Sequence, residues 1–328
     1  MKYNNKIIHR FDDNIKINDE SREWCEHFFE TKFNRKPIFL NSATSGIYLF
    51  FKSLNLKDTD EVIVQDYTHP VCKNVLTALG HKYVTCKNND LLIDVDDAIS
   101  KCNTNTKVIV YTMLNGFVSS DILKLKNFCA SKDILLLEDA SPALGNTVQN
   151  QLCGTIGDAA VFSFNMTKLI ALGGGGCFIS KHKYITEYVE NHYQINFSKS
   201  NDYEALTFHI TWSLWDLLKS ELEKYDEYVE QRQDLHDRLK KKIPHLYSTD
   251  SSHCYNAASV LLPNDLIHKK ELLTSLLTEN KIKFRQNVYH YEKDDTLYKS
   301  HIDLPFHRNI TDDHIDIFCK IFRDAGIT

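Results

Sequence analysis

Short apolar stretches alternate with segments of helical periodicity along the first 180 residues of the chain. The apolar stretches predict strands at residues 37–40, 60–64, 82–86, 107–111 and 134–139. Helical spacing before and between them predicts helices that include residues 20–31, 94–100 and 120–131. Strands that alternate with helices in this way form right-handed βαβ units. We therefore expect an α/β fold with a mainly parallel, mixed central sheet that is flanked by helices.

The pattern changes after residue 180. A long helical pattern covers residues 213–241, and two more helices are predicted at residues 269–279 and 311–322. Apolar stretches predict strands at residues 257–262 and 282–284. These elements indicate a smaller α+β domain attached to the long helix. The predicted division is a large domain of residues 1–210 and a small C-terminal domain of residues 211–328.

A lysine and a glycine run lie between two apolar stretches near the middle of the chain. Lys168 follows the stretch 160–164, and the glycines at residues 173–176 lead into the stretch 177–180. A Walker loop has its glycines before the lysine and a helix after it, and a dinucleotide fingerprint also needs a following helix. Both nucleotide-binding loops are excluded by this context. By itself, Lys168 is as well explained as a solvated surface residue among the 39 Lys and Arg residues of the chain.

Polar residues follow several of the predicted strands directly. Thr44, His69 and Asp139 each come just after the carboxyl end of a strand. In parallel sheets, ligands gather at this edge, so the three residues are candidates for one site. Ser42 and Thr44 are also ordinary N-cap residues of the helix that follows them, and a helix N-terminus can bind phosphate.

Composition narrows the possible partners. The 328-residue chain has a net charge of −5 and no basic block, which argues against binding to nucleic acid. No signal-peptide core and no apolar run of membrane-spanning length is found. Nine cysteines without a Cys-x-x-Cys pair are typical of reduced thiols rather than of disulfides or a zinc site. We expect a cytoplasmic protein with no metal and no membrane partner.

Several motifs occur in the order found in one known family. Residues 42–44 (Ser-Ala-Thr) are similar to its Ser-Gly-Thr phosphate motif, and residues 60–64 (Asp-Glu-Val-Ile-Val) to one of its strands. Residues 138–140 (Glu-Asp-Ala) and the Gly-Asp, Ser-Phe and Thr-Lys pairs within 157–168 form its most specific block. Residues 304–313 resemble its closing Leu-Pro and Leu-Thr-Glu-Glu motifs. From about residue 20 onward, the chain resembles the fold-type I, pyridoxal-phosphate sugar aminotransferases of the DegT/DnrJ/EryC1/StrS group.

The resemblance implies that Lys168 and Asp139 hold opposite ends of one pyridoxal 5'-phosphate molecule. Lys168 would bond to the cofactor aldehyde and later shuttle protons. Proton transfer needs a neutral amine, and hence a pKa well below the ordinary value of about 10.4. Asp139 would pair with the protonated pyridine nitrogen, because a cation there requires a carboxylate partner.

The resemblance also assigns the rest of the cofactor site. Ser163, Thr44 and Ser45 would hold the phosphate through hydroxyl and backbone N–H groups. His69 falls where the family has an aromatic residue over the ring face, and an imidazole can stack there. His69 is equally well explained as a turn residue before Pro70.

Three positions depart from the family pattern. Pro142 stands where the family has a glutamine near the ring hydroxyl, and residues 174–176 are Gly-Gly-Gly instead of Glu-Gly-Gly. The asparagine-and-arginine motif that reaches a neighbouring subunit's cofactor falls on Thr207-Phe208-His209. One branch of the family has histidine in place of the lysine and performs dehydration, and Lys168 argues against that branch.

The resemblance implies a homodimeric, pyridoxal-phosphate-dependent aminotransferase. Its substrates would be a nucleotide-linked deoxysugar with a keto group and an amino-acid donor, glutamate. Two other hypotheses stay open. One is an aminotransferase of a cyclitol or another polyhydroxy ketone. The other, motivated by Pro142 and Thr207, is a non-catalytic homologue that binds the cofactor or a sugar nucleotide.

Overall fold

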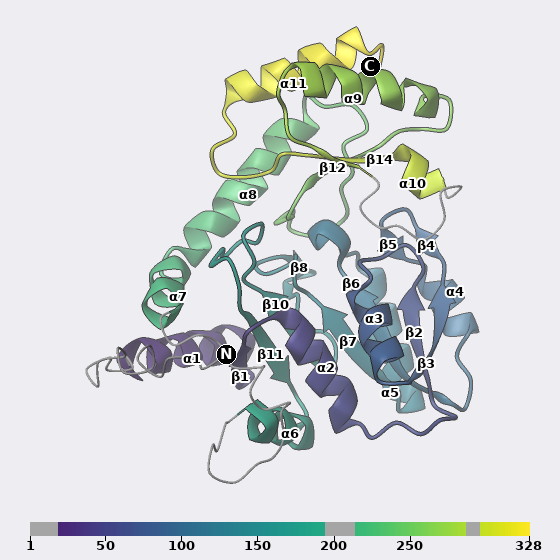
Figure 1. The fold of residues 1–328 in the computed structure, drawn as a ribbon, viewed down its shortest axis with the longest axis vertical. Helices are drawn as coiled ribbons and strands as arrows, with labels where there is room; N and C mark the ends of the chain where they lie inside the picture. Colours follow the sequence, from purple (N-terminus) through teal and green to yellow (C-terminus); the bar gives the residue numbers. More distant parts are fainter. Residues whose placement is uncertain (1–18, 194–213, 287–295) are drawn as a thin grey trace, which may run out of the picture.

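The computed structural model of the chain describes residues 19–193, 214–286 and 296–328 (Figure 1). Its centre is a seven-stranded sheet. Across the sheet the strands are β1 (Pro37–Leu40), β11 (Gly176–Ser180), β10 (Ala159–Ser163), β7 (Leu135–Asp139), β6 (Thr106–Thr112), β2 (Glu61–Gln65) and β3 (Lys82–Cys86). β11 pairs antiparallel with both of its neighbours, and all other pairs are parallel. The predicted α/β class and mainly parallel, mixed sheet are confirmed.

Helices cover both faces of this sheet and make three layers (Figure 1). Apolar residues of one face form a core with α2 (Ala43–Ser53), α3 (Val71–Ala78) and α6 (Lys183–Tyr193). Those of the other face form a core with α1 (Asp19–Phe33), α4 (Val95–Ser100), α5 (Asp121–Lys132) and α7 (Trp215–Leu222). The sequence did not predict two hairpins of two-residue strands, which are too short to give a periodic signal. They are β4 (Asn88–Asn89) with β5 (Leu92–Ile93), and β8 (Thr147–Val148) with β9 (Gln151–Leu152).

A second sheet lies beyond the carboxyl edge of the first (Figure 1). Its three antiparallel strands are, in order, β12 (Ala258–Leu261), β14 (His301–Leu304) and β13 (Arg285–Gln286). The helical elements of this part are η5 (Ile267–Lys269), α9 (Lys270–Glu279), α10 (Thr296–Ser300) and α11 (Asp312–Asp324). Of the helices in the described ranges, none combines the length and apolar character needed to cross a bilayer.

The predicted long helix over residues 213–241 is wrong in one respect, because the structure forms two helices. α7 ends at Leu222 and α8 (Tyr225–Lys240) begins three residues later, with Lys224 at non-helical dihedrals of φ −101° and ψ 10°. The break lets α7 pack against α1, while α8 leaves the large core and enters the small one (Figure 1). The predicted domain boundary at residue 210 lies outside the described residues and stays a prediction.

The predicted strand over residues 282–284 is also misplaced. The Ile282 N–H donates to Leu277 O, which closes the end of α9, and regular pairing begins only at Arg285 opposite Asp303. The apolar residues Ile282 and Phe284 pack on the small core without belonging to the strand. This shift matters for the site, because the strand that forms carries an arginine.

Candidate active site

The carboxyl edge of the large sheet gathers the residues predicted for the site. Asp139 ends β7, Ser163 ends β10, α2 begins after β1, and His69 follows β2. These strands run in the same direction, so their carboxyl ends meet at one edge. The six residues brought to this edge are Thr44, Ser45, His69, Asp139, Ser163 and Lys168.

A closed loop after β10 holds Lys168 in place. The Phe164 N–H donates to Gly175 O at 3.0 Å, and the Leu172 N–H donates to Phe164 O at 2.8 Å, which ties the base of the loop together. Within the loop, the Lys168 N–H donates to Asn165 O at 2.9 Å. The glycine run therefore closes a turn that fixes the backbone of the lysine.

The amine of Lys168 and the carboxylate of Asp139 share one environment. The pKa of Lys168 is lowered to about 8, mainly by burial, while Asp139 acts to raise it and the charges of Arg285 and Arg232 act to lower it. Asp139 is 3% exposed. Among the described residues its carboxylate accepts one hydrogen bond, from the Ser141 N–H at 3.3 Å. The pair thus combines an amine that is easily made neutral with a buried carboxylate that has acceptor capacity to spare.

His69 lies beside this pair. Its Nδ1 accepts a hydrogen bond from the Val71 N–H at 3.3 Å, so the turn before α3 uses this side chain. Burial lowers the pKa of His69, Asp139 raises it, and Lys168 and Arg285 lower it. The turn role is therefore present in the structure, and the ring-stacking role stays a prediction.

The start of α2 presents hydroxyl and N–H groups to the same edge. Ser42 caps the helix by accepting the Ser45 N–H at 3.2 Å, and the Ser45 hydroxyl donates to Asn41 Oδ1 at 2.5 Å. Thr44 lies in the first turn with its side chain exposed. N–H groups in the first turn of a helix have no intrahelical acceptors and favour an anion. The cap belongs to Ser42, and Thr44 is left available for a ligand.

Gly176 allows this helix start and Ser163 to lie close together. It pairs with Ser163 across β10 and β11. A Cβ atom at this position would lie 2.5 Å from Ala43 N and 2.7 Å from Phe162 O, distances that real Cβ atoms do not adopt. The last residue of the glycine run is thus required for a cradle between α2 and the end of β10.

These residues fit pyridoxal phosphate, the cofactor implied by the sequence. The cradle at Thr44, Ser45 and Ser163 offers neutral donors that suit a phosphate. Asp139 is a buried acid with unused acceptor positions, which suits a ring cation. Lys168 has the lowered pKa that capture of an aldehyde needs.

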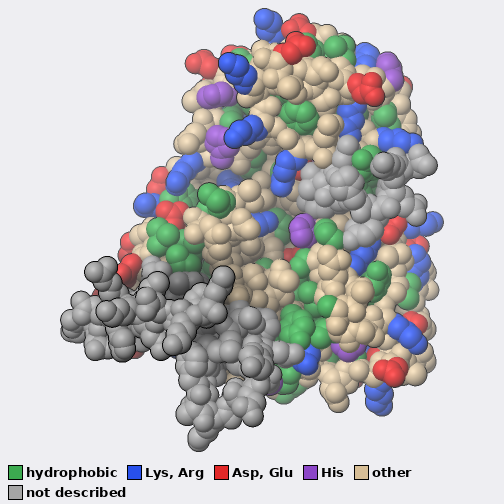
Figure 2. Space-filling view, in the orientation of Figure 1, with side chains coloured by type: hydrophobic (Ala, Val, Ile, Leu, Met, Phe, Trp, Pro, Cys, Tyr) green, Lys and Arg blue, Asp and Glu red, His purple; other side chains and the backbone are tan. Residues whose placement is uncertain are grey.

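A cavity of about 440 Å³ opens from Lys168 toward the small sheet. It is lined from the Lys168 loop, α7, α8, β13 and the end of β14. Its charged residues Arg232, Arg285 and Asp303 were not predicted from the sequence, because none of them belongs to a motif that was assigned to the site. Figure 2 shows Lys and Arg atoms and a histidine at the middle of this face, where the two parts of the molecule meet. One sequence signal near these residues was the Asn115-Gly116 pair, which is typical of a turn. Asn115 adopts φ 51° there and contacts Asp303 and Arg285.

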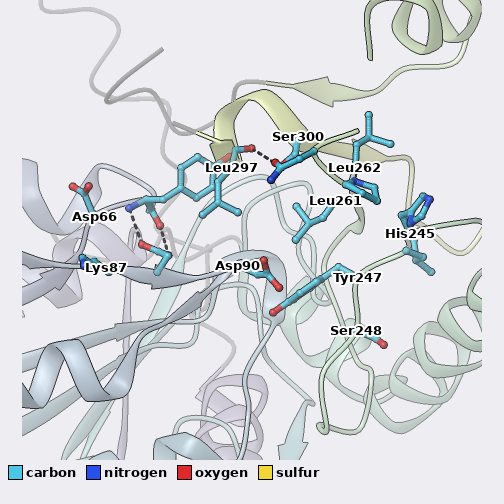
Figure 3. A pocket seen from close by; sticks show the side chains of 15 residues that line it. Asp66, Lys87, Asp90, His245, Tyr247, Ser248, Leu261, Leu262, Leu297 and Ser300 are labelled. Carbon is cyan, nitrogen blue, oxygen red and sulfur yellow. Dashed lines mark hydrogen bonds between the residues drawn. The ribbon is translucent and has the colours of Figure 1, made fainter. Parts of the chain in front are cut away.

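A larger cavity of about 820 Å³ lies between the β4–β5 hairpin and the small sheet (Figure 3). Asp90 and the Tyr247 hydroxyl face each other across it, and Lys87 lies at its other end (Figure 3). None of the six predicted site residues lines this cavity. The smaller cavity is the candidate substrate site because it contains Lys168.

Of two departures from the family pattern, Pro142 lies among the described residues and the segment 207–209 does not. Pro142 lies in the turn after β7, and its carbonyl oxygen would be 2.7 Å from a Cβ atom at Gly116, which adopts φ 91°. A proline has no N–H to offer there. Thr207-Phe208-His209 lies outside the described residues.

Comparison with known proteins places this geometry in a family. The DegT/DnrJ/EryC1/StrS aminotransferase family matches residues 13–323. The GDP-perosamine synthase of Vibrio cholerae is 25% identical over 279 residues, which cover 80% of this chain and 76% of that protein. The UDP-4-amino-4,6-dideoxy-N-acetyl-beta-L-altrosamine transaminase of Campylobacter jejuni is 23% identical, and the alignment covers 90% of this chain and 85% of that protein.

Solved structures show the same fold. PseC of Helicobacter pylori, an aminotransferase involved in the biosynthesis of pseudoaminic acid, superposes with a TM-score of 0.81 at 20% identity. The superposition covers 95% of this chain and 91% of that one, and it confirms the predicted fold-type I architecture. The chain belongs to the DegT/DnrJ/EryC1/StrS aminotransferase family and is, as its sequence predicts, an aminotransferase that depends on pyridoxal phosphate.

Proposed function

We propose that the chain transfers an amino group from an amino acid, glutamate, to the keto carbon of a nucleotide-linked deoxysugar. In this exchange the amino acid is oxidised to its 2-oxo acid, and the sugar carbon is reduced as it gains the amine. The observation that carries the proposal is the shared site of Lys168 and Asp139, which opens into a cavity large enough for a sugar.

Lys168 and Asp139 have the central roles in the proposed mechanism. When bound, pyridoxal phosphate supplies an aldehyde that captures amines and a ring that takes up electrons. Lys168 Nζ would hold the aldehyde end in the resting enzyme and, once displaced, would move protons to and from the reacting carbon. Its pKa of about 8 makes both tasks accessible near neutral pH. Asp139 would hold a proton at the ring nitrogen.

The remaining predicted residues would orient the cofactor. Thr44, Ser45 and Ser163 would bind the phosphate in the cradle that Gly176 permits. His69, held in its turn by the Val71 N–H, would cover one face of the ring. A ring fixed at its phosphate, face and nitrogen presents its reactive end to the cavity.

The names of the relatives support a nucleotide sugar over a cyclitol. The Vibrio cholerae and Campylobacter jejuni proteins are named for a GDP-linked and a UDP-linked amino sugar. The Bacillus subtilis relative, 23% identical, is a spore coat polysaccharide biosynthesis protein. We include in the proposal a role in polysaccharide biosynthesis. We also propose a homodimer, which sedimentation analysis of the purified protein would test.

Covalent trapping tests the site and an assay tests the substrate. The protein is loaded with pyridoxal phosphate, reduced with borohydride and mapped by mass spectrometry. We expect the cofactor on the peptide that contains Lys168. We expect neither label nor amino transfer in Lys168→Ala, and wild-type behaviour in Lys183→Ala, a matched exposed lysine. Amino transfer is then measured with nucleotide-linked keto sugars and with keto-cyclitols. Label on another lysine would contradict the site, and transfer only to cyclitols would contradict the substrate class.

A further inference from the structure

The cavity beside Lys168 holds more basic than acidic side chains. In the described part of the chain its lining includes five Lys and Arg residues but only two carboxylates, Glu221 and Asp303. Asp303 accepts three hydrogen bonds on Oδ1 and pairs with Arg285 through Oδ2, so its charge is directed mainly at that one arginine. A cavity with this imbalance suits a ligand that carries negative charge.

Arg285 is fixed in this cavity by one of its nitrogens. Its Nη2 lies 3.1 Å from Asp303 Oδ2 and 3.3 Å from Asn115 Oδ1. Asp303 Oδ1 accepts hydrogen bonds from the Ser259 hydroxyl at 2.5 Å and from His301 Nε2 at 2.7 Å. The other donors of the guanidinium make no hydrogen bond to any described residue, and 43% of the side chain is exposed. The network therefore holds a preorganised fork with free N–H groups.

Arg232 faces the same cavity from α8, and its partners among the described residues are neutral. Its Nη1 donates to Tyr255 O at 2.8 Å and to Asn256 Oδ1 at 3.1 Å, and the guanidinium lies 6.0 Å from the centre of the Phe306 ring. No carboxylate of the described residues forms an ion pair with it. Burial lowers its pKa, which shows that the charged form is held at a cost. An anion in the cavity would offset that cost.

We propose that these two arginines bind the two carboxylates of a dicarboxylic amino-acid donor, Arg285 the α-carboxylate and Arg232 the side-chain carboxylate. This inference rests on the proposed function. The assignment of each arginine to one carboxylate follows from its position relative to Lys168. The α-carboxylate is two bonds from the amino group that must reach the place of Lys168 Nζ, and Arg285 acts electrostatically on both Lys168 and His69. Arg232 acts on Lys168 more weakly than Arg285 does and is not among the charges that influence His69.

Phosphate is the other source of anionic oxygens, through the diphosphate of a sugar nucleotide. That group is attached to the sugar and is separated from a ring keto carbon by several bonds. A guanidinium next to the reactive amine is therefore better placed for a carboxylate. Arginine binds both carboxylate and phosphate in bidentate geometry, so the position next to the amine is what favours the carboxylate.

Separate half-reactions test the assignment. Protein loaded with pyridoxal phosphate is mixed with L-glutamate or L-alanine, and the spectral change of the cofactor gives the rate and the half-saturating concentration. In Arg285→Gln we expect that concentration to rise by about 10- to 100-fold for both amino acids. Arg285→Lys should recover part of the loss. In Arg232→Gln we expect a rise of about tenfold for glutamate and none for alanine, which lacks the second carboxylate. Arg238→Gln, on the exposed side of the same helix, should match wild type.

Binding and the second half-reaction complete the test. Glutarate, an unreactive dicarboxylate, should bind to the loaded wild-type protein in calorimetry and should not bind to Arg285→Gln. The step from the aminated enzyme to the keto sugar should be impaired much less than the glutamate step, since no donor carboxylate takes part in it. If Arg232→Gln does not fold, Arg232→Lys is used, with the same contrast between glutamate and alanine expected.

The outcomes separate this inference from the proposed function. Loss of the sugar step with an unchanged glutamate step would assign the arginines to a diphosphate and overturn the inference. Equal glutamate kinetics in the wild type and both variants would overturn it as well. A wild-type protein that exchanges amino groups with no amino acid would instead refute the proposed function.

Discussion

Two buried carboxylates, one at each end of the site, differ in how they are satisfied. Asp139, on the large sheet, is 3% exposed, and its carboxylate accepts a single hydrogen bond from the described residues, from the Ser141 N–H. Asp303, on the small sheet, is 2% exposed, accepts hydrogen bonds from three side chains and pairs with Arg285. Both carboxylates are buried, but among the described residues Asp303 receives three hydrogen bonds on Oδ1 and an ion pair at Oδ2, whereas the Asp139 carboxylate receives one hydrogen bond.

This difference distinguishes a carboxylate that can bind a ligand from a carboxylate that stabilises the fold. A buried carboxylate is expensive unless it is paired and hydrogen-bonded. At Asp139 we propose that a cationic ring nitrogen supplies a further partner. At Asp303 the partners belong to the protein and hold an arginine at the cavity. The two carboxylates should therefore respond in opposite ways to the same substitution.

The largest effect is expected at Asp139. Asp139→Asn should lower the rate of amino transfer by about 100- to 1,000-fold, because it removes the charge that keeps the ring nitrogen protonated. The unfolding free energy of the cofactor-free Asp139→Asn variant should stay the same or rise, since the substitution removes a buried charge with few hydrogen bonds. Steady-state kinetics and denaturant titration measure the two. A destabilised cofactor-free variant with normal turnover would break the comparison.

Asp303→Asn should act mainly on stability. Removing the charge leaves His301 and Arg285 without their acidic partner, and we expect a loss of about 3 kcal/mol in unfolding free energy. Asp313→Asn, an exposed carboxylate on α11, should change it by less than about 0.5 kcal/mol.

The loss at Asp303 should depend on pH. Burial acts to raise the pKa of Asp303, but His301, Arg285 and the Ser259 hydrogen bond together lower it to about 2. A carboxyl group with a depressed pKa stabilises the fold above its unfolded pKa, and this contribution is lost as the pH falls. The gap between wild type and Asp303→Asn should be full above about pH 4 and shrink toward pH 2. A gap that does not change with pH would contradict the ionic role.

Gly176→Ala tests the cradle beside Asp139. The new Cβ atom would meet Ala43 N and Phe162 O, so we expect a loss of about 1–3 kcal/mol in stability and weaker binding of pyridoxal phosphate. Gly174→Ala is the matched control, because a Cβ atom there meets nothing within 4 Å. Thermal denaturation and cofactor titration measure both variants. Equal behaviour of the two alanine variants would refute the close approach.

The smallest effect is a shift in the pH dependence of cofactor loading. Capture of the aldehyde needs the neutral amine of Lys168, so the loading rate should rise with pH and level off above about pH 8. Arg285→Gln removes a charge that lowers the pKa of Lys168 and should move the plateau to higher pH. Asp139→Asn removes a charge that raises the pKa and should move the plateau to lower pH. Shifts in the same direction would show that these two charges do not both act on Lys168.

The cofactor end of the site could be predicted from local sequence. Asp139 ends a strand, His69 follows one, and Lys168 precedes a glycine run. The strands themselves were found because apolar stretches bounded by polar turns keep their character whatever they pack against. Once the strands are known to be parallel, their carboxyl ends must meet, and the motif residues meet with them.

The substrate end could not be predicted in this way. Arg285 lies where the sequence indicates a strand three residues too early, and Asn115, Ser259, His301 and Asp303 come from separate segments of the chain. No periodic pattern relates these residues, since only the contacts between separate segments of the fold bring them together.

The sequence by itself determined the alternation of strands and helices, the carboxyl-edge position of the predicted cofactor residues and the family. Hydrophobic periodicity and short motifs are local properties, so they can be read without coordinates. Only the tertiary structure decided that Asp303 is held by three side-chain hydrogen bonds and an arginine, that the Asp139 carboxylate accepts one hydrogen bond from the described residues, and that Arg285 and Arg232 line one cavity with Lys168. Burial and charge balance depend on all neighbours of a group at once, and those neighbours are brought together only by folding.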